Sequence, residues 1–431
     1  PAPPKRSLQT IGIPEPVRTH FRNMDLDALR QMNPDCERYK ELPMRYHSAY
    51  PLYNIQSSSA AAQGEGSSCF GYPTALYKAT DQMDSQIYAL RRFDNVRTSA
   101  SVVNNVVQRW HEIRHPGIVS LYGVVQEKGA LFFSYMYHAS AQSLKERFID
   151  QRGPLLVESL IWRLLIQLLS ATRYVHMRGL AVRVIEPAHI ILTSGTCARY
   201  STVGVLDILE FETRKTPVEL QHDDLIKLGR VVLSLMTRAV ITAKNVDDAL
   251  SLMKQSYSND LQRVVLALLS GKLTVFQICN HQTVCERMQE EYDTAMAATD
   301  SLHSLLRNEY ENSRILRLML KLGFINERPT DPHNTMLPNW SETGDQYVLK
   351  LFRDHVFHQI DGDGLPILDA GHVLTALNKL DAGDSEEILL SSRDGKDLLV
   401  VSYADVQRCL ESSFMELSQQ SQVALSNAAA G

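Results

Sequence analysis

The hydrophobic pattern of this chain changes from strand-like to helix-like, and that change restricts its possible folds more than any other feature. Four short runs rich in β-branched and aromatic residues read as strands, and they are Ala75–Ala79, Ile87–Phe93, Ile118–Val125 and Ala130–Tyr137. After Pro154, apolar residues recur at helical spacing until Gly179, a natural C-terminal stop. Strands followed by helices predict an α+β fold with a small β lobe and a larger helical lobe.

Length and composition set outer limits on that fold. With 431 residues, 44% of them hydrophobic and 22% charged, the chain is expected to form two or three soluble units with real cores. A formal net charge of −5 argues against a surface built to coat nucleic acid. No run approaches the roughly 18 consecutive apolar residues of a membrane helix, so we expect no membrane partner.

The cysteines indicate a reducing compartment. Six of them are scattered along the chain, whereas a disulfide framework packs them densely into a short sequence. Cys279 and Cys285, with His281 between them, lack a second ligand pair at zinc-finger spacing. We therefore expect reduced thiols and an intracellular protein.

A long polar run follows the helical lobe. From Cys279 to Ile325 the sequence contains no proline, and its first glycine is Gly323. An apolar seam at spacings near 3.5 runs through it, formed by Val284, Met288, Ala295, Leu302, Leu305, Leu306 and Met319. Such a run predicts a coiled coil, or a helix that leaves its own domain. The alternative is that these residues form the last helices of a globular lobe.

Seven segments from Phe70 onward occur in the order of protein-kinase landmarks. HPGIVSLYGVV, beginning at His115, is close to the HPNIV signature. YALRR at Tyr88 matches the VAIK strand, RVIEPAHIIL at Arg183 the catalytic loop, and VLDIL at Val205 the DFG position. The remaining matches are FGYPTALYKA for the glycine-rich loop, ALFFSYMY before the hinge, and DDLIKLG for the helix that anchors the large lobe. Seven weak signals in the right order predict a two-lobed, protein-kinase-like fold.

Most of the residues that phosphoryl transfer needs are replaced. A kinase requires a catalytic Asp, metal ligands and a cation on the phosphates. The catalytic Asp is Val184, the lysine that follows it is Glu186, and the metal-binding Asn is His189. The VAIK lysine is Arg91, and its usual Glu partner is Val106. The sequence therefore predicts a pseudokinase with no catalytic residues.

Nucleotide binding requires less than catalysis does. Ala89 supplies an apolar roof for adenine, Ser134 and Met136 supply hinge backbone groups, and Ser143 a ribose contact. Arg91 supplies a cation for phosphates. The competing interpretation is that Ala89 is an ordinary core residue and that Arg91 only pairs with surface carboxylates.

Two further positions complete the predicted nucleotide site. Gly71 allows the backbone to approach the phosphates closely. Asp207 keeps one metal ligand at the DFG position, although the glycine of that motif is Leu209. The predicted contacts are thus Gly71, Ala89, Arg91, Ser134, Met136, Ser143 and Asp207. We expect a nucleotide to be bound, with its need for magnesium left open.

The pattern divides the chain into five parts. They are an N-terminal extension (1–49) with a helix expected from Met24 to Met32, a pseudokinase domain (50–278), a coiled coil (279–325), a small, mainly helical C-terminal domain (326–418) and a disordered tail (419–431).

This arrangement resembles the pseudokinase regulatory subunit of the poly(A)-specific PAN deadenylase. The resemblance extends from Tyr50 to about Leu417. Its most specific stretches are FGYPTALYKA, YMYHASAQSL and LRLMLKLGFINERP. A generic pseudokinase has no reason to carry the last of these.

The resemblance implies a function and partners. It implies a homodimer formed through the coiled coil, with ATP bound but not turned over. It also implies a C-terminal domain that recruits the catalytic exonuclease subunit, binding of GW-repeat adapters of microRNA silencing, and a cytoplasmic location that includes P-bodies. The family's N-terminal zinc finger and its peptide motif for poly(A)-binding protein have no counterpart here. We therefore expect weak or indirect RNA binding, and contact with poly(A)-binding protein through a region absent from this sequence.

Two other functions stay open at this stage. One is an atypical active kinase that uses Glu186 or Asp207 as its base. The other is an interaction module whose nucleotide cleft is empty.

Overall fold

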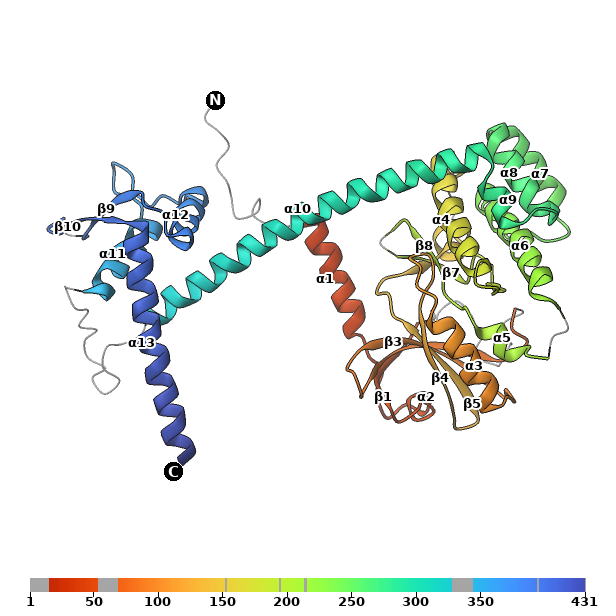
Figure 1. Ribbon diagram of the computed structural model, residues 1–431, viewed down its shortest axis with the longest axis horizontal. Helices are drawn as coiled ribbons and strands as arrows, with labels where there is room; N and C mark the ends of the chain where they lie inside the picture. The colour runs from red at the N-terminus through yellow and green to blue at the C-terminus, as the bar shows by residue number, and fades with distance from the viewer. Residues whose placement is uncertain are drawn as a thin grey trace. The chain divides into compact units, whose positions relative to one another are not determined.

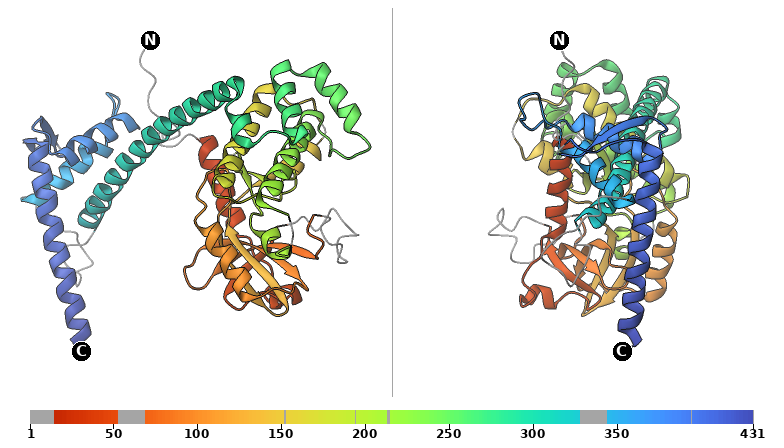
Figure 2. Two further views of the ribbon diagram at one scale, coloured as in Figure 1. Left: turned by 45° about the vertical axis from the view of Figure 1, so that its right-hand side comes forward. Right: turned by 90° about the vertical axis from the view of Figure 1, so that its left-hand side faces the viewer.

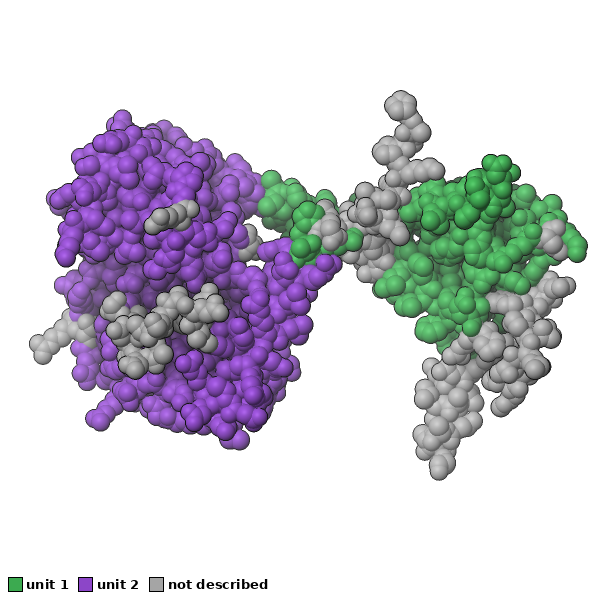
Figure 3. Space-filling model, turned by 180° about the vertical axis from the view of Figure 1, so that it is seen from behind, with its two compact units in different colours: residues 1–19, 297–431 green, residues 20–296 purple. Residues whose placement is uncertain are grey.

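The computed structural model describes residues 15–52, 69–151, 153–193, 195–212, 215–327, 344–393 and 395–430. The chain divides into two compact units, one of residues 20–296 and one of residues 1–19 with 297–431 (Figure 3). Within the described ranges, no helix is both long enough and apolar enough to cross a membrane. Most of the specific segment LRLMLKLGFINERP is described, but its last two residues are not.

The first unit contains a five-stranded antiparallel sheet, of which β1, β3, β4 and β5 are labelled in Figure 1. The strand order is β1-β2-β3-β5-β4. Its strands are β1 (Tyr46–Pro51), β2 (Thr74–Asp81), β3 (Ile87–Asp94), β4 (Leu121–Glu127) and β5 (Ala130–Met136). All four predicted strands are confirmed, although β4 begins three residues late because Ile118 instead forms an isolated bridge with Tyr200. β1 was not predicted. It begins before residue 50, so the pseudokinase domain starts earlier than expected.

The two faces of this sheet pack against different partners. Because side chains alternate along a strand, Leu131, Phe133 and Tyr135 of β5 join the main core of the unit. Phe132 lies on the opposite face, in a smaller core with Tyr46 of β1. Helix α3 (Ala100–His111), capped by Ser99, adds its buried apolar stripe to the main core.

The larger lobe is helical, as predicted. Its helices are α4 (Glu158–His176), α6 (Pro217–Thr237), α7 (Val246–Ser256), α8 (Asn259–Ser270) and α9 (Val275–Cys279). Gly179 has a φ of 69° just past α4, the left-handed conformation that favours glycine at a helix end. A capping box of Thr216 and Glu219 with Pro217 at the first position fixes the start of α6.

Shorter elements line the region between the lobes. They are the strands β6 (Gln142–Ser143), β7 (Ile190–Thr193) and β8 (Cys197–Tyr200), a π-helical turn η3 (Lys145–Ile149), and the short helix α5 (Val205–Leu209). The three strands form one small antiparallel sheet.

The N-terminal helix differs from its prediction. α1 runs from Glu15 to Leu29, so it begins well before the predicted start at Met24. A second short helix, α2 (Glu37–Lys40), follows. The buried Lys78 donates to the carbonyls of Ala28 and Arg30. These carbonyls lie at the end of α1, where the intrahelical partners are missing, and the lysine therefore anchors that end to the β lobe.

The predicted long helix is confirmed as α10 (Gln282–Asn326), 45 residues in one piece. The start of the predicted seam does not face a partner chain, because Val284 is buried in the core of the first unit and Met288 packs against it. Near the other end of α10, Ile315, Leu318 and Leu322 join the core of the second unit.

The C-terminal unit is small and mainly helical, as expected, with one hairpin added. Around its core lie α11 (Asp345–Phe357), α12 (Ala370–Ala382), β9 (Glu387–Ser391), β10 (Leu398–Ser402) and α13 (Tyr403–Ala430). The expected disordered tail is wrong for residues 419–430, which continue α13, the blue helix of Figure 2.

Candidate functional site

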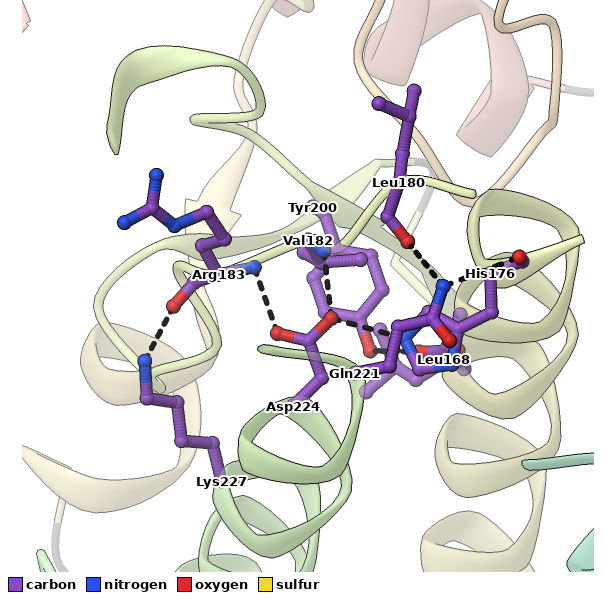
Figure 4. Close-up of polar contacts among 10 residues, drawn as sticks. Leu168, His176, Leu180, Val182, Arg183, Tyr200, Gln221, Asp224 and Lys227 are labelled. Carbon is purple, nitrogen blue, oxygen red and sulfur yellow. Dashed lines mark hydrogen bonds and ion pairs between the residues drawn. The ribbon is translucent and has the colours of Figure 1, made fainter. Parts of the chain in front are cut away.

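A buried carboxylate holds the loop that corresponds to a catalytic loop (Figure 4). Asp224 of α6 is fully buried. Its Oδ1 accepts from the backbone N–H of Arg183 at 2.7 Å. Its Oδ2 accepts from the N–H of Val182 at 2.7 Å and lies 3.0 Å from Nε2 of His176. Charged acceptors make strong hydrogen bonds, and Asp224 therefore sets the path of the loop.

Two more side chains of α6 fix the same loop. Nζ of Lys227 donates to the carbonyl of Arg183 at 2.6 Å, and Nε2 of Gln221 donates to that of Leu180 at 2.9 Å (Figure 4). Arg183 is held at a φ of 65°, a conformation that non-glycine residues adopt only when their surroundings over-determine it. The loop thus has a rigid frame although its catalytic residues are replaced.

The positions of the missing catalytic groups are apolar or oppositely charged. Val184, in place of the base, is buried in the main core. Glu186 and His189 close a turn in which the N–H of His189 donates to the carbonyl of Glu186 at 2.9 Å. Val106, in place of the Glu that pairs with the strand lysine, is buried in the same core. The position of the catalytic base therefore carries a buried aliphatic side chain that cannot accept a proton.

His189 is buried at the phosphate end of the predicted cleft, against Phe70. Its ring centroid is 5.0 Å from that of Phe70, and the guanidinium of Arg91 lies 5.7 Å from the Phe70 centroid. Burial, with a smaller effect of the charge on Arg91, lowers the pKa of His189 to about 3. The imidazole is therefore neutral at physiological pH.

Cys69 lies close to His189. Burial, followed by the charge of Glu186, raises the pKa of the Cys69 thiol to about 12. Ligand atoms of Cys69, Glu186 and His189 all lie within 4.8 Å of one another. Sequence reasoning missed this cluster because Cys69 is more than 100 positions from the other two.

Asp207 is not directed at the phosphate end. It lies in α5, where its Oδ2 accepts from the indole Nε1 of Trp110 at 2.7 Å and its Oδ1 lies 3.2 Å from Nη1 of Arg183. A carboxylate with both oxygens occupied is a poor metal ligand.

The turn directly after β8 is a better structural match for the DFG position. It consists of Thr202 and Val203, both buried, and Gly204 with a φ of 80°. The carbonyl of Val203 accepts from the hydroxyl of Tyr135 at 2.7 Å, which ties this turn to β5. On this assignment the remaining metal-binding carboxylate is replaced by a threonine.

The predicted adenine contacts are only partly brought together. Ala89 pairs with Tyr135 across β3 and β5 and packs against the main core. The hydroxyl of Ser134 points to the other face of the sheet, 2.7 Å from that of Tyr46. The backbone N–H of Met136 already donates to the carbonyl of Ser120 at 3.0 Å. The contacts predicted for Ser134 and Met136 are backbone groups, and Ser134 lies inside the sheet, opposite Leu90 of β3 and Gly123 of β4. Ala89 lies on the face of β3 that carries Arg91.

Ser143 and Gly71 lie on loop-like segments. The hydroxyl of Ser143, in β6, donates to Glu146 at 2.9 Å, which is a local cap rather than an open ribose contact. Gly71 has a φ of 69° and open space around it, which fits the close backbone approach predicted for it.

Comparison with protein families identifies the C-terminal part of the chain. Residues 279–417 match the model of the Pan3 C-terminal knob domain. The chain is 37% identical over 432 residues to the "PAN2-PAN3 deadenylation complex subunit pan3" of Dictyostelium discoideum, covering 97% of this chain and 57% of that protein. It is 36% identical over 450 residues to the human subunit of the same name, covering 96% of this chain and 50% of that protein. The chain thus spans about half the length of these relatives.

Solved structures extend the match over both units. The complex of Neurospora crassa PAN2 (WD40-CS1) with PAN3 (pseudokinase and C-term) matches with a TM-score of 0.80 and 33% identity, covering 94% of this chain and all of that one. The Drosophila melanogaster PAN3 pseudokinase matches with a TM-score of 0.75 and 33% identity, covering 88% of this chain and 99% of that one.

Proposed function

The chain belongs to the PAN3 family of pseudokinases, and from this premise we propose that it is a non-catalytic regulatory subunit of a poly(A)-shortening deadenylase. In this role it recruits the exonuclease subunit, named PAN2 in the relatives, and so promotes mRNA decay. One observation carries the proposal. The chain contains both a pseudokinase unit and a small C-terminal unit, called the knob below, whose hairpin of β9 and β10 leaves apolar side chains exposed.

The exposed hairpin supports recruitment of the exonuclease. Leu389 of β9 and Val400 of β10 stand directly opposite each other, and 57% and 66% of their surfaces are exposed. Leu398, 63% exposed, lies two residues from Val400 and extends the same face. Clustered apolar side chains on a small unit are typical of protein interfaces. We therefore assign this face to the exonuclease.

The experiment is capture of the purified exonuclease by the full chain. Replacing Leu389 and Val400 together with Glu is expected to abolish capture, because two charges then stand in an apolar interface. Val218→Glu, at an equally exposed apolar position on α6, is the control and should leave capture unchanged. Undiminished capture by the double variant would contradict the assignment.

A truncation separates the roles of the two units. The cut belongs after Met296, where the first unit ends, because Cys279 and Val284 are buried in that unit's core. Residues 1–296 are expected to lose both self-association and capture of the exonuclease. Retention of either would place that activity in the pseudokinase unit.

We propose a homodimer through α10. Four of its leucines are more than half exposed, and they are Leu302, Leu306, Leu316 and Leu320. Their spacings of 4, 10 and 4 fit alternating d and a positions of one heptad frame. Within a single chain, each of these four leucines leaves more than half of its surface exposed. Pairing with a second copy would bury that surface.

We propose that the knob binds tryptophans of GW-repeat adapters. A cavity of about 250 Å³ lies between the end of α10 and α11, lined by Met319, Leu322, Gly323, Asn326, Glu327, Arg353, Phe357 and His358. Oδ1 of Asn326 is buried and has no hydrogen-bond partner among the described residues. An indole fits this combination, because it supplies a large apolar ring with one N–H donor.

We propose that the pseudokinase unit binds ATP without hydrolysing it. Ala89 and the buried Arg91 share the face of β3 that points to the main core, and Arg91 offers phosphates a fixed cation. The second candidate is a cleft that binds no nucleotide. It is favoured by the buried rings of Phe70 and His189, which contact each other and occupy the phosphate end.

The remaining assignments rest on the family alone. They are a cytoplasmic location including P-bodies, weak or indirect RNA binding, and contact with poly(A)-binding protein through a region outside this sequence. Sedimentation with labelled poly(A) tests the RNA assignment, which tight binding by the chain alone would contradict.

A further inference from the structure

We propose that Cys69, Glu186 and His189 bind a divalent cation of the zinc class at the former phosphate end of the cleft. All three residues belong to the pseudokinase unit, and the site can be tested in the absence of nucleotide. No catalytic role is assigned to it.

The geometry of the three side chains supports the proposal. Their ligand atoms lie within 4.8 Å of one another. Tetrahedral zinc with ligands at 2.0–2.3 Å separates those ligands by about 3.3–3.8 Å. Each pair of ligand atoms therefore has to come closer by at most about 1.5 Å. Rotation of the half-buried Cys69 and Glu186 side chains can supply this movement. His189 needs to move least, because the turn with Glu186 holds its backbone.

The imidazole provides a second, independent observation. His189 is 5% exposed. Its Nδ1 is buried and has no hydrogen-bond partner in the part of the chain that the structure describes. A buried polar atom without a partner costs free energy, and a metal ion would relieve that cost. A neutral imidazole nitrogen is also the form that binds metal.

The donor set selects the kind of ion. One thiolate, one imidazole and one carboxylate form a mixed set that suits zinc. Magnesium and calcium prefer oxygen ligands alone. Three protein ligands leave the fourth position of a tetrahedral ion open. The site therefore differs in chemistry from the magnesium sites of active kinases.

The two anionic ligands balance the charge of a divalent ion. Binding displaces the proton of the Cys69 thiol to solvent, so a thiolate and the Glu186 carboxylate offset the two positive charges of the ion. Lys227 and Arg91 are cations that oppose binding, since both charges act on Cys69 and that of Arg91 also acts on His189. Glu186 is thus required, and a neutral side chain there should weaken binding.

Cobalt(II) substitution tests the thiolate ligand in the full chain without nucleotide. One equivalent of cobalt is expected to produce a thiolate-to-metal charge-transfer band that Cys69→Ser abolishes. Cys285→Ser, at an exposed cysteine, is the control and should keep the band. A band that persists in Cys69→Ser, or no band in the unmodified chain, overturns the proposal.

Zinc titration tests the other two ligands. Glu186→Gln and His189→Phe should each lower zinc affinity at least about tenfold, since even loss of a hydrogen bond to a ligand typically costs 10- to 100-fold. Zinc should raise the melting temperature of the unmodified chain and not of these variants. Melting temperatures in chelator show that each variant folds. Unchanged affinity in either folded variant overturns the assignment of that ligand set.

Discussion

The indole Nε1 of Trp110 in α3 donates to Oδ2 of Asp207 in α5 at 2.7 Å. The other carboxylate oxygen of Asp207 lies 3.2 Å from Nη1 of Arg183, and Arg183 also forms an ion pair with Glu210. The acidic residue that sequence favours as a metal ligand is therefore part of a structural contact. That contact joins α3, α5 and the loop held by Asp224.

The first prediction concerns this hydrogen bond. Trp110→Phe removes the N–H donor from a buried site and is expected to lower the free energy of unfolding by about 1.5–3 kcal/mol, the range for a hydrogen bond to a charged group. Chemical denaturation measures the change. Asp207→Asn keeps an acceptor oxygen for the indole and should cost less. An equal or larger loss in Asp207→Asn would assign the effect to the Arg183 ion pair instead.

A second prediction tests the buried carboxylate of α6. Asp224→Asn replaces one acceptor oxygen by an NH₂ group, which cannot accept a hydrogen bond. The two carboxylate oxygens of Asp224 contact the N–H groups of Val182 and Arg183 and the ring of His176. At least one donor then loses its partner, and we expect a loss of about 3 kcal/mol or more. The neighbouring Asp223→Asn, at an exposed pair with Lys215, should not change the free energy of unfolding. Similar effects at both positions would show that Asp224 does not frame the loop.

The sequence predicts the larger elements well because their signals are local. The strands β2, β3 and β5 carry β-branched and aromatic runs, and α10 has no proline and no glycine before Gly323. β1 was missed because it pairs with β2 through a register shift between His47 and Tyr50. An irregular strand of this kind lacks the alternation that identifies strands.

The candidate site was harder to predict because its contacts are distant in sequence. Trp110 and Asp207 are 97 positions apart, and no local pattern relates them. The motif VLDIL looks like a degenerate DFG segment, yet these residues form a helix. Ser134 was predicted to offer hinge backbone groups, and the structure places it inside β5, opposite Leu90 of β3 and Gly123 of β4.

A third prediction addresses nucleotide binding. ATP is expected to raise the melting temperature of the chain, because a ligand that binds only the folded state stabilises it. Arg91→Met should remove most of that rise. The matched change Arg92→Met, next in sequence and paired with Glu41 and Asp94, should keep it. No rise in the unmodified chain at millimolar ATP would favour the empty cleft, and phosphate transfer above background would overturn the pseudokinase assignment.

The knob cavity gives a fourth prediction. Asn326→Leu removes the buried acceptor and should weaken binding of a tryptophan-containing GW peptide by about tenfold, the equivalent of 1.4 kcal/mol for one hydrogen bond. Fluorescence anisotropy of the labelled peptide measures it. A peptide with phenylalanine in place of tryptophan should bind more weakly to the unmodified chain and show little further loss with Asn326→Leu. Equal loss for both peptides would mean that Asn326 shapes the cavity and does not bind the indole.

The last prediction concerns the seam of α10. Leu302 and Leu306 are four residues apart on one helix face and are 53% and 57% exposed. Replacing both with Glu places four like charges across a paired seam, and two such helices can no longer bury that face together. We expect a monomer by light scattering at micromolar concentration, with helix content unchanged by circular dichroism. Met415→Glu, at an exposed position on α13, should stay dimeric. A double variant that stays dimeric would show that self-association uses another surface, because charge at both positions is incompatible with a d–a leucine seam.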